Sequence, residues 1–256
     1  MLLAADVGNS QTVVGLFSGE ELVQHWRLGT DPMDTPDEMA LTLAGLLRLE
    51  GLEFPRDIDG AVVGSVVPVV TETYREMLTR YVPKTALIVG PGVRTGLAMK
   101  VDNPREIGAD RIVNAVAAYE LYGAPSIVVD FGTATSFEAV DRDGVFVGGA
   151  IAPGIRVSSE ALIEHAARLP KVETLTPTSA IGRSTVSALQ SGIVYGFAGQ
   201  VDAIIERLTA ELGPGVTTVA TGGLASAVLG ECRRVDHHDP WLTLKGLRMI
   251  WERNLA

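Results

Sequence analysis

The stretches LLAADVGNSQT (residues 2–12) and SIVVDFGTAT (residues 126–135) share one pattern, from which the rest of the architecture follows. In each, an apolar run is followed by an aspartate, any one residue and a glycine. Small residues with hydroxyl or amide side chains come next. Apolar residues resume after both, which is typical of a hairpin between two strands. Because the two stretches lie about half a chain apart, the sequence predicts an internal duplication.

Each duplicated half continues with similar elements. In the first half, ELVQHWRLGT (residues 21–30) predicts a third strand. The apolar spacing of the residues after it predicts a helix, and DGAVVGSVVPVV (residues 59–70) then predicts a buried strand. The second half repeats the strand patterns and ends them with TTVATGG (residues 217–223), a last strand that ends in a glycine pair. We therefore predict an α/β protein of two βββαβα-like halves, residues 1–114 and 115–256, with an interdomain cleft into which both turns open.

The composition limits the possible functions. The net charge is −10 and no cluster of Lys or Arg stands out, so we expect no nucleic-acid partner, because a phosphate backbone requires a basic surface. Cys232 is the only cysteine, which excludes an intrachain disulfide and fits the cytoplasm. Neither a signal peptide nor a run of about 18 apolar residues is visible, so we expect neither export nor a membrane location.

The two turns predict a site for a nucleoside triphosphate. Their glycines let the backbone approach a ligand, and successive N–H groups beside hydroxyl and amide side chains bind anions. Asp6 and Asp130 at the strand ends add hard oxygen ligands for a cation shared with the phosphates. The pair Gly222-Gly223 follows a strand and allows the backbone to lie flat against an adenine or ribose. The alternative is two tight turns whose aspartates only cap backbone amides.

The charged stretch DNPREIGADR (residues 102–111) lies between apolar segments and leads into the amphipathic pattern RIVNAVAAYEL. It is typical of a loop and the first turn of a helix. From the residues alone, Asp110 is a first-turn acid that satisfies free helix amides beside Arg111.

A set of motifs, in order across essentially the whole chain, resembles the type III pantothenate kinase family. The motifs are DVGNSQT, DNPREIGADR, VDFGTAT, IAPGI, IGRSTVSALQSG and ATGG, of which DNP with GADR is the most discriminating. That family belongs to the actin, sugar-kinase and Hsp70 superfamily of duplicated ribonuclease-H-like halves. The resemblance implies ATP-dependent phosphorylation of pantothenate, the first step toward coenzyme A. It also implies a homodimer that uses ATP with Mg²⁺ and a monovalent cation, K⁺ or NH₄⁺.

The resemblance further implies roles for individual residues. Asp110 is expected to be catalytic and to accept the proton of the pantothenate hydroxyl, and Arg111 to hold the substrate carboxylate or the transferred charge. Asp6 is expected to contact Mg²⁺ through water, and Asp130 to bind the monovalent cation. Thr185 is expected to contact substrate or to cap the helix that follows it. The residues expected to bind ATP are Asp6, Val7, Gly8, Asn9, Ser10, Gln11, Thr12, Val13, Thr133, Gly222 and Gly223; those expected to bind pantothenate are Gly108, Ala109, Asp110, Arg111 and Thr185.

Some positions leave alternatives open. Many family members carry a tyrosine shortly before DNP that lines the pantothenate pocket, whereas this chain has Val101 directly before it. A regulatory protein of the same family that binds nucleotide without transferring phosphate is one alternative function, and a sugar or acetate kinase on the same scaffold is another. We expect a solvated loop at residues 237–239, and core or subunit contacts for Trp241 and Trp251.

Overall fold

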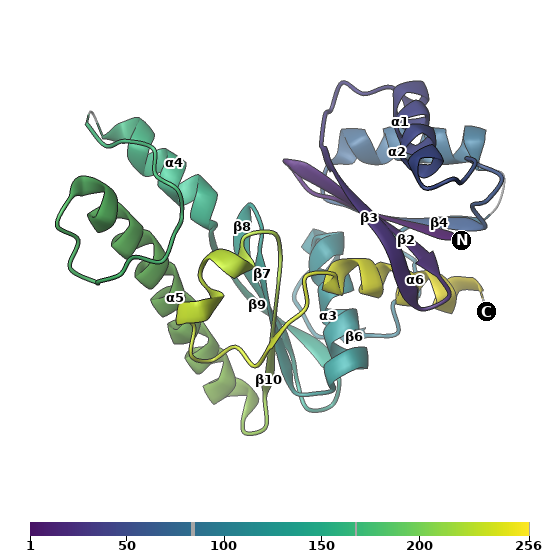
Figure 1. The fold of residues 1–256 in the computed structure, drawn as a ribbon. Coiled ribbons are helices and arrows are strands. Elements are labelled where there is room, and N and C mark those ends of the chain that lie inside the picture. The colour runs from purple at the N-terminus through teal and green to yellow at the C-terminus, as the bar shows by residue number, and fades with distance from the viewer. Residues whose placement is uncertain (83–84, 167, 256) are drawn as a thin grey trace. The chain divides into compact units, whose positions relative to one another are not determined.

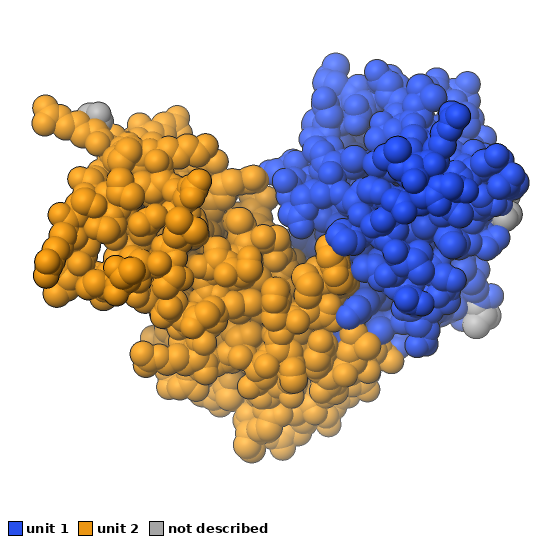
Figure 2. All heavy atoms as spheres, viewed as in Figure 1, with its two compact units in different colours: residues 1–96, 103–117, 243–256 blue, residues 97–102, 118–242 orange. Residues whose placement is uncertain are grey.

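The computed structural model describes most of the chain, namely residues 1–82, 85–166 and 168–255. The chain forms two compact units, which Figure 2 colours separately. Unit 1 consists of Met1–Gly96, Asn103–Ala117 and Thr243–Ala256, and unit 2 of Leu97–Asp102 and Ala118–Leu242. The boundary at residue 114 that we predicted for the duplicated halves stays a proposal. No helix in the described part of the chain is long and apolar enough to cross a lipid bilayer.

Unit 1 is built on a five-stranded sheet (Figure 1). Its elements are β1 (Leu2–Val7), β2 (Gln11–Ser18), β3 (Glu21–Gly29), α1 (Pro36–Leu49), β4 (Gly60–Ser65), α2 (Pro68–Tyr81), β5 (Thr85–Ile88), η1 (Pro104–Glu106), the first part of α3 (Ala109–Tyr122), and α6 (Leu242–Leu255). The strands lie in the order β3-β2-β1-β4-β5. β1 pairs antiparallel with β2 and parallel with β4.

Unit 2 repeats this arrangement on a six-stranded sheet. Its elements are β6 (Ala98–Met99), the end of α3, β7 (Ser126–Phe131), β8 (Ala134–Val140), β9 (Val145–Pro153), α4 (Ile155–His165), α5 (Thr185–Leu212), β10 (Thr217–Thr221), η2 (Ala225–Ala227), η3 (Leu229–Glu231) and β11 (His237–His238). The order β9-β8-β7-β10-β11 matches that of sheet 1, with β6 added beside β9. β7 pairs antiparallel with β8 and parallel with β10. The predicted internal duplication is therefore confirmed.

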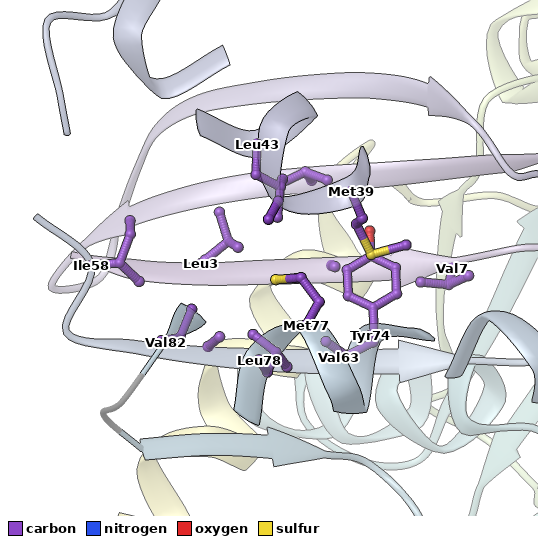
Figure 3. Close-up of a cluster of buried hydrophobic side chains, with 14 of the residues drawn as sticks. Leu3, Val7, Met39, Leu43, Ile58, Val63, Tyr74, Met77, Leu78 and Val82 are labelled. Atoms are coloured by element: carbon purple, nitrogen blue, oxygen red, sulfur yellow. The ribbon is translucent and has the colours of Figure 1, made fainter. Parts of the chain in front are cut away.

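Helices α1 and α2 cover one face of the sheet in unit 1. Figure 3 shows Met39 and Leu43 of α1 packed with Met77 of α2 over the buried Leu3 of β1. The start of α1 follows from its sequence. Thr35 and Glu38 form a capping box, in which each side chain accepts a hydrogen bond from the backbone N–H of the other, and a proline occupies the first helical turn.

Helix α6 covers the opposite face of the same sheet (Figure 1). Glycines on β4 make room for it: a Cβ at Gly64 would lie 2.9 Å from Leu247 Cδ2, and one at Gly60 would overlap the Trp251 ring. The last helix thus belongs to the first unit, and the expectation that Trp251 makes core contacts is confirmed.

Two local predictions were wrong. Residues 68–70, expected at the end of a strand, begin α2, because Pro68 is favoured in the first turn of a helix and β4 already ends at Ser65. The expected solvated loop at residues 237–239 instead starts with β11, which pairs with β10. Asp239 is buried and accepts hydrogen bonds from the Tyr122 hydroxyl (3.3 Å) and the Trp241 backbone N–H (3.1 Å).

Candidate active site

The first aspartate lies at the carboxyl end of β1. Asp6 is the penultimate residue of the strand, is half-buried, and stands beside Gly64 in the parallel register with β4. Leu3, Ala5 and Val7 of β1 face the core with α1 and α2. Because successive side chains of a strand alternate between faces, Asp6 extends from the other face, which α6 covers. The carboxyl ends of parallel strands are where ligands bind in open α/β sheets.

The turn after β1 offers backbone donors. Gly8 closes it by donating its N–H to the Gln11 carbonyl oxygen at 3.0 Å. Asn9 and Ser10 are exposed, and within the described residues neither donates its backbone N–H to another group. Two adjacent N–H groups on an exposed turn can bind an anion such as a phosphate.

Gln11 is exposed, and its side-chain oxygen accepts a hydrogen bond from Arg27 Nη1 at 3.0 Å. Three other residues predicted to bind ATP in unit 1 support the turn from within the sheet. Val7 is fully buried, and the half-buried Val13 pairs with Asp6 across the hairpin. Thr12 is also buried, and its hydroxyl lies 2.9 Å from that of Thr30. These side chains hold the turn rather than line its exposed surface.

Asp110 lies in the first turn of α3, as the sequence predicts. Its Oδ1 accepts a hydrogen bond from the Arg111 backbone N–H at 2.8 Å. A Cβ at Gly108 would lie 2.5 Å from this Oδ1 and 3.3 Å from Val66 Cγ1, so the carboxylate fits only beside a glycine. Val66 in turn donates its N–H to the Val7 carbonyl at 3.1 Å. Asp110 therefore lies at the same end of the sheet as the first turn.

Burial raises the pKa of Asp110 above its ordinary value of 3.8. The loss of hydration is the largest cause, and the hydrogen bond and positive charge of Arg111 offset it only in part. A carboxyl group with a raised pKa is a better proton acceptor than an exposed one, and such groups concentrate at functional sites. Asp110 also accepts a hydrogen bond from a backbone N–H in the first turn of α3. It therefore has a structural role in the helix whether or not it also takes part in the reaction.

Asp130 in unit 2 occupies the position that corresponds to Asp6. It is the penultimate residue of β7 and lies in register with Thr221 of β10. Gly222 has a φ of +94°, and a Cβ there would lie 2.5 Å from Asp130 Oδ1 and 2.6 Å from the Phe131 nitrogen. The predicted glycine pair, in which Gly223 is exposed, therefore adjoins the Asp130 carboxylate.

The second turn is shorter than the first. Gly132 donates its N–H to the Ala134 carbonyl at 3.0 Å, which leaves Thr133 exposed at the tip. Gly154 donates to the Thr133 carbonyl at 3.2 Å, and a Cβ at Gly154 would lie 2.7 Å from the Gly132 oxygen. Gly154 was missing from the predicted site residues, although the motif IAPGI contains it.

The carboxylates of Asp6 and Asp130 fit hard cations, which prefer oxygen ligands. Within the described residues no group of three or more His, Cys, Asp or Glu side chains is positioned to bind a metal. A cation at either aspartate would therefore share its coordination with phosphate oxygens, water or backbone carbonyls, as expected for Mg²⁺ bound with a nucleotide.

Thr185, predicted to contact pantothenate, is exposed and is the first residue of α5. The prediction that it caps this helix is wrong. Ser184 is the cap, because its hydroxyl accepts from the Ser187 N–H at 3.2 Å while Ser187 accepts from the Ser184 N–H at 3.0 Å. The Thr185 side chain is thus not used in the cap, and its contact with substrate stays a prediction.

Comparison with known proteins gives a consistent result over the full chain. The family model described as type III pantothenate kinase matches residues 2–207. A Streptomyces griseus protein of that description is 54% identical and covers 100% of this chain and 99% of its own length. A Thermobifida fusca protein of the same description is 55% identical, with 99% and 100% covered.

Solved structures with similar folds are more distant in sequence. A Campylobacter jejuni protein, described as a Baf family transcriptional activator, aligns with a TM-score of 0.64 at 18% identity over 99% of this chain and 98% of its own. Component A of an Acidaminococcus fermentans (R)-2-hydroxyglutaryl-CoA dehydratase aligns with a TM-score of 0.58 at 14% identity, with 100% and 99% covered. These likenesses confirm the predicted α/β fold of the actin-like ATPase type.

Proposed function

The chain belongs to the type III pantothenate kinase family and is thus an ATP-dependent pantothenate kinase, and we propose that the two turns and the α3 loop carry out the transfer. The observation that supports this most directly is the position of Asp110. Its half-buried carboxylate has a raised pKa and lies at the end of the sheet where the first turn exposes its N–H groups.

We propose that both turns hold ATP. The backbone N–H groups of Asn9 and Ser10 bind phosphate oxygens, Thr133 contributes from the second turn, and Gly222-Gly223 supports the nucleoside. Asp6 would hold Mg²⁺, and Asp130, which adjoins Gly222, would hold K⁺ or NH₄⁺. Bound cations neutralise the charge that spreads over the phosphoryl oxygens during transfer.

The acceptor hydroxyl is oriented by Asp110 in this proposal. The carboxylate accepts the proton as the hydroxyl oxygen bonds to the γ-phosphorus and the bond to ADP breaks. Because phosphoryl transfer passes through a loose transition state, positioning contributes more than proton removal. Arg111, with its planar fork of donors, holds the pantothenate carboxylate or the transferred group. Gly108 and Ala109 let the loop approach the substrate, and Thr185 contacts it.

We further propose that the protein works in the cytoplasm as a homodimer. The family resemblance supports this assembly, and exposed apolar side chains on unit 2 offer surface for a second copy. These are Ile151, Leu162, Ile181 and Val186. Light scattering of the full chain tests the assembly through its molar mass.

A coupled assay for ADP tests the function. With Mg²⁺ and K⁺ present, we expect ADP formation that depends on pantothenate, with loss of turnover but not of ATP binding in Asp110→Asn. Glu120→Gln, an exposed acid on the same helix, is the matched control and is expected to keep its activity. Nucleotide binding without turnover for any acceptor would instead identify a regulatory protein. Turnover with a sugar or with acetate, but not with pantothenate, would identify a different kinase.

A further inference from the structure

Unit 1 contains a cavity of about 170 Å³ to which the proposed transfer assigns no role. It lies between the end of β3, the loop after it, and helices α1 and α2. Only Thr12 belongs both to its wall and to the residues proposed to bind ATP. The cavity therefore needs its own explanation.

The hydroxyl of a buried tyrosine faces this cavity. Tyr74 of α2 lines it and is 2% exposed, and Figure 3 shows the hydroxyl oxygen directed toward Met39 of α1. Among the residues that the structure describes, this hydroxyl makes no hydrogen bond. Tyrosine hydroxyls in such a setting usually find a hydrogen-bond partner. A guest in the cavity would supply that partner.

The cavity is also negatively charged. Asp31 and Asp34 line it, and its wall includes no Lys, Arg or His. Within the described part of the chain, the Asp34 carboxylate forms no ion pair. Burial raises the pKa of Asp34, and the charges of Asp31 and Glu38 raise it further. Burial and the charge of Asp34 in turn raise the pKa of Tyr74, so the hydroxyl and the carboxylate lie within electrostatic reach of each other.

The remaining wall is partly apolar and partly formed by the side chains of Thr12, Thr30 and Thr42. Leu28, Met39 and Val70 present hydrocarbon or thioether surface to the cavity. A bare metal ion is held mainly by carboxylates, and within the described residues no group of three or more His, Cys, Asp or Glu side chains is positioned to bind one. A cavity of about 150 Å³ holds a benzene molecule, so this one has room for roughly six non-hydrogen atoms.

We propose that the cavity binds a small primary alkylammonium ion. The ammonium group donates hydrogen bonds to the Asp34 carboxylate and the Tyr74 hydroxyl oxygen, and the alkyl chain lies against Met39 and Val70. The Thr12 hydroxyl, 2.9 Å from that of Thr30, connects this wall to the first turn. The proposal does not depend on the kinase reaction, because it is tested by binding alone.

Methyl NMR of the full chain, labelled with ¹³C at its methionine methyl groups, tests the proposal. Propylammonium chloride is titrated at constant ionic strength, with propanol and propionate as neutral and anionic comparators. We expect a saturable shift of the Met39 resonance with a millimolar dissociation constant, as is usual for so small a ligand. Met77 is also buried in the same core but does not line the cavity, so its resonance should stay in place.

Variants show which groups bind the ion. Asp34→Asn should weaken binding roughly tenfold or more, and Tyr74→Phe about three- to tenfold, whereas Glu76→Gln, an exposed acid on α2, should leave the affinity unchanged. Circular dichroism checks the fold, and Tyr74→Phe alone tests the site if Asp34→Asn unfolds. The proposal is overturned if propylammonium gives no saturable shift, if propanol binds equally well, or if the affinity survives removal of both the carboxylate and the hydroxyl.

Discussion

Asp110 is placed where its charge is unfavourable for folding, although the proposed transfer requires the charged form. Its folded-state pKa lies above the unfolded value because burial disfavours the ionised carboxylate. The stability that the neutral carboxyl contributes is therefore fully present below the unfolded pKa and is lost as the pH rises through the folded pKa. At neutral pH the ionised side chain lowers the free energy of unfolding, as is common for catalytic groups.

Replacing Asp110 with Asn should separate these two effects. At neutral pH we expect a higher midpoint of thermal unfolding, because the amide carries no charge to bury, and turnover lower by about 10²- to 10⁴-fold, because the proton acceptor is lost. The gain in midpoint should shrink as the pH approaches the ordinary aspartate value of 3.8. Calorimetry across pH measures this, and a lower midpoint at neutral pH would contradict it.

The pH dependence of the wild-type enzyme provides a second check on the same residue. Because Asp110 must be ionised to accept a proton, kcat/KM should fall on the acid side with a midpoint above 3.8. The raised pKa moves this limb toward neutral pH. Steady-state kinetics from acid to neutral pH, with circular dichroism to confirm folding, would show the limb. A limb at or below 3.8 would mean that Asp110 is not the titrating group.

Helix α6 shows how a distant segment completes the sheet that carries the first turn. It packs on β4 through positions that lack a Cβ, and Gly60 lies directly under the indole ring of Trp251. An indole ring cannot move aside as the end of a flexible side chain can. Position 60 therefore has little room for any side-chain atom.

Gly60→Ala should destabilise the protein by about 1–3 kcal/mol, because the added methyl group overlaps Trp251. Adding Trp251→Leu should recover part of the loss by making space. Gly45→Ala is the matched control: it lies within α1 with open space at its Cβ position and should stabilise by about 0.5–1 kcal/mol. Urea unfolding monitored by circular dichroism compares them, and equal effects of Gly60→Ala and Gly45→Ala would exclude the steric explanation.

Elements set by local pattern were predictable from the sequence, whereas those set by distant contacts were not. The hairpins around Asp6 and Asp130 were predicted because their Asp-x-Gly pattern is local and repeated. The start of α2 was missed because valines on both sides of Pro68 favour a strand as much as a helix. The role of Gly154 and the unpaired Tyr74 hydroxyl depend on which segments meet, which spacing along the chain does not reveal.

The two units contribute separate parts of the proposed nucleotide site. The first turn belongs to unit 1, and the second turn and the glycine pair belong to unit 2. If one ATP molecule uses both, its affinity depends on the whole molecule rather than on either unit. Closure around the ligand would then exclude water and limit wasteful hydrolysis.

A non-hydrolysable ATP analogue tests this dependence. At a concentration of about 100 times its dissociation constant, it should raise the free energy of unfolding by about 2.7 kcal/mol. Gly8→Ala in unit 1 and Gly222→Ala in unit 2 should each reduce that gain at the same concentration, since each crowds one turn. Gly199→Ala, in α5 with open space at its Cβ position, should keep it. A full gain in either turn variant would mean that ATP uses only one unit.

The helix that covers the Asp6 face of the first sheet comes after every residue of unit 2 in the sequence. A ribosome therefore delivers all of unit 2 before it delivers the segment that seals the sheet of unit 1. During synthesis, the face of β4 that carries Gly60 and Gly64 therefore stays uncovered until α6 has been made. The surroundings of Asp6 are thus complete only after the chain has passed through the whole of unit 2 and returned to unit 1.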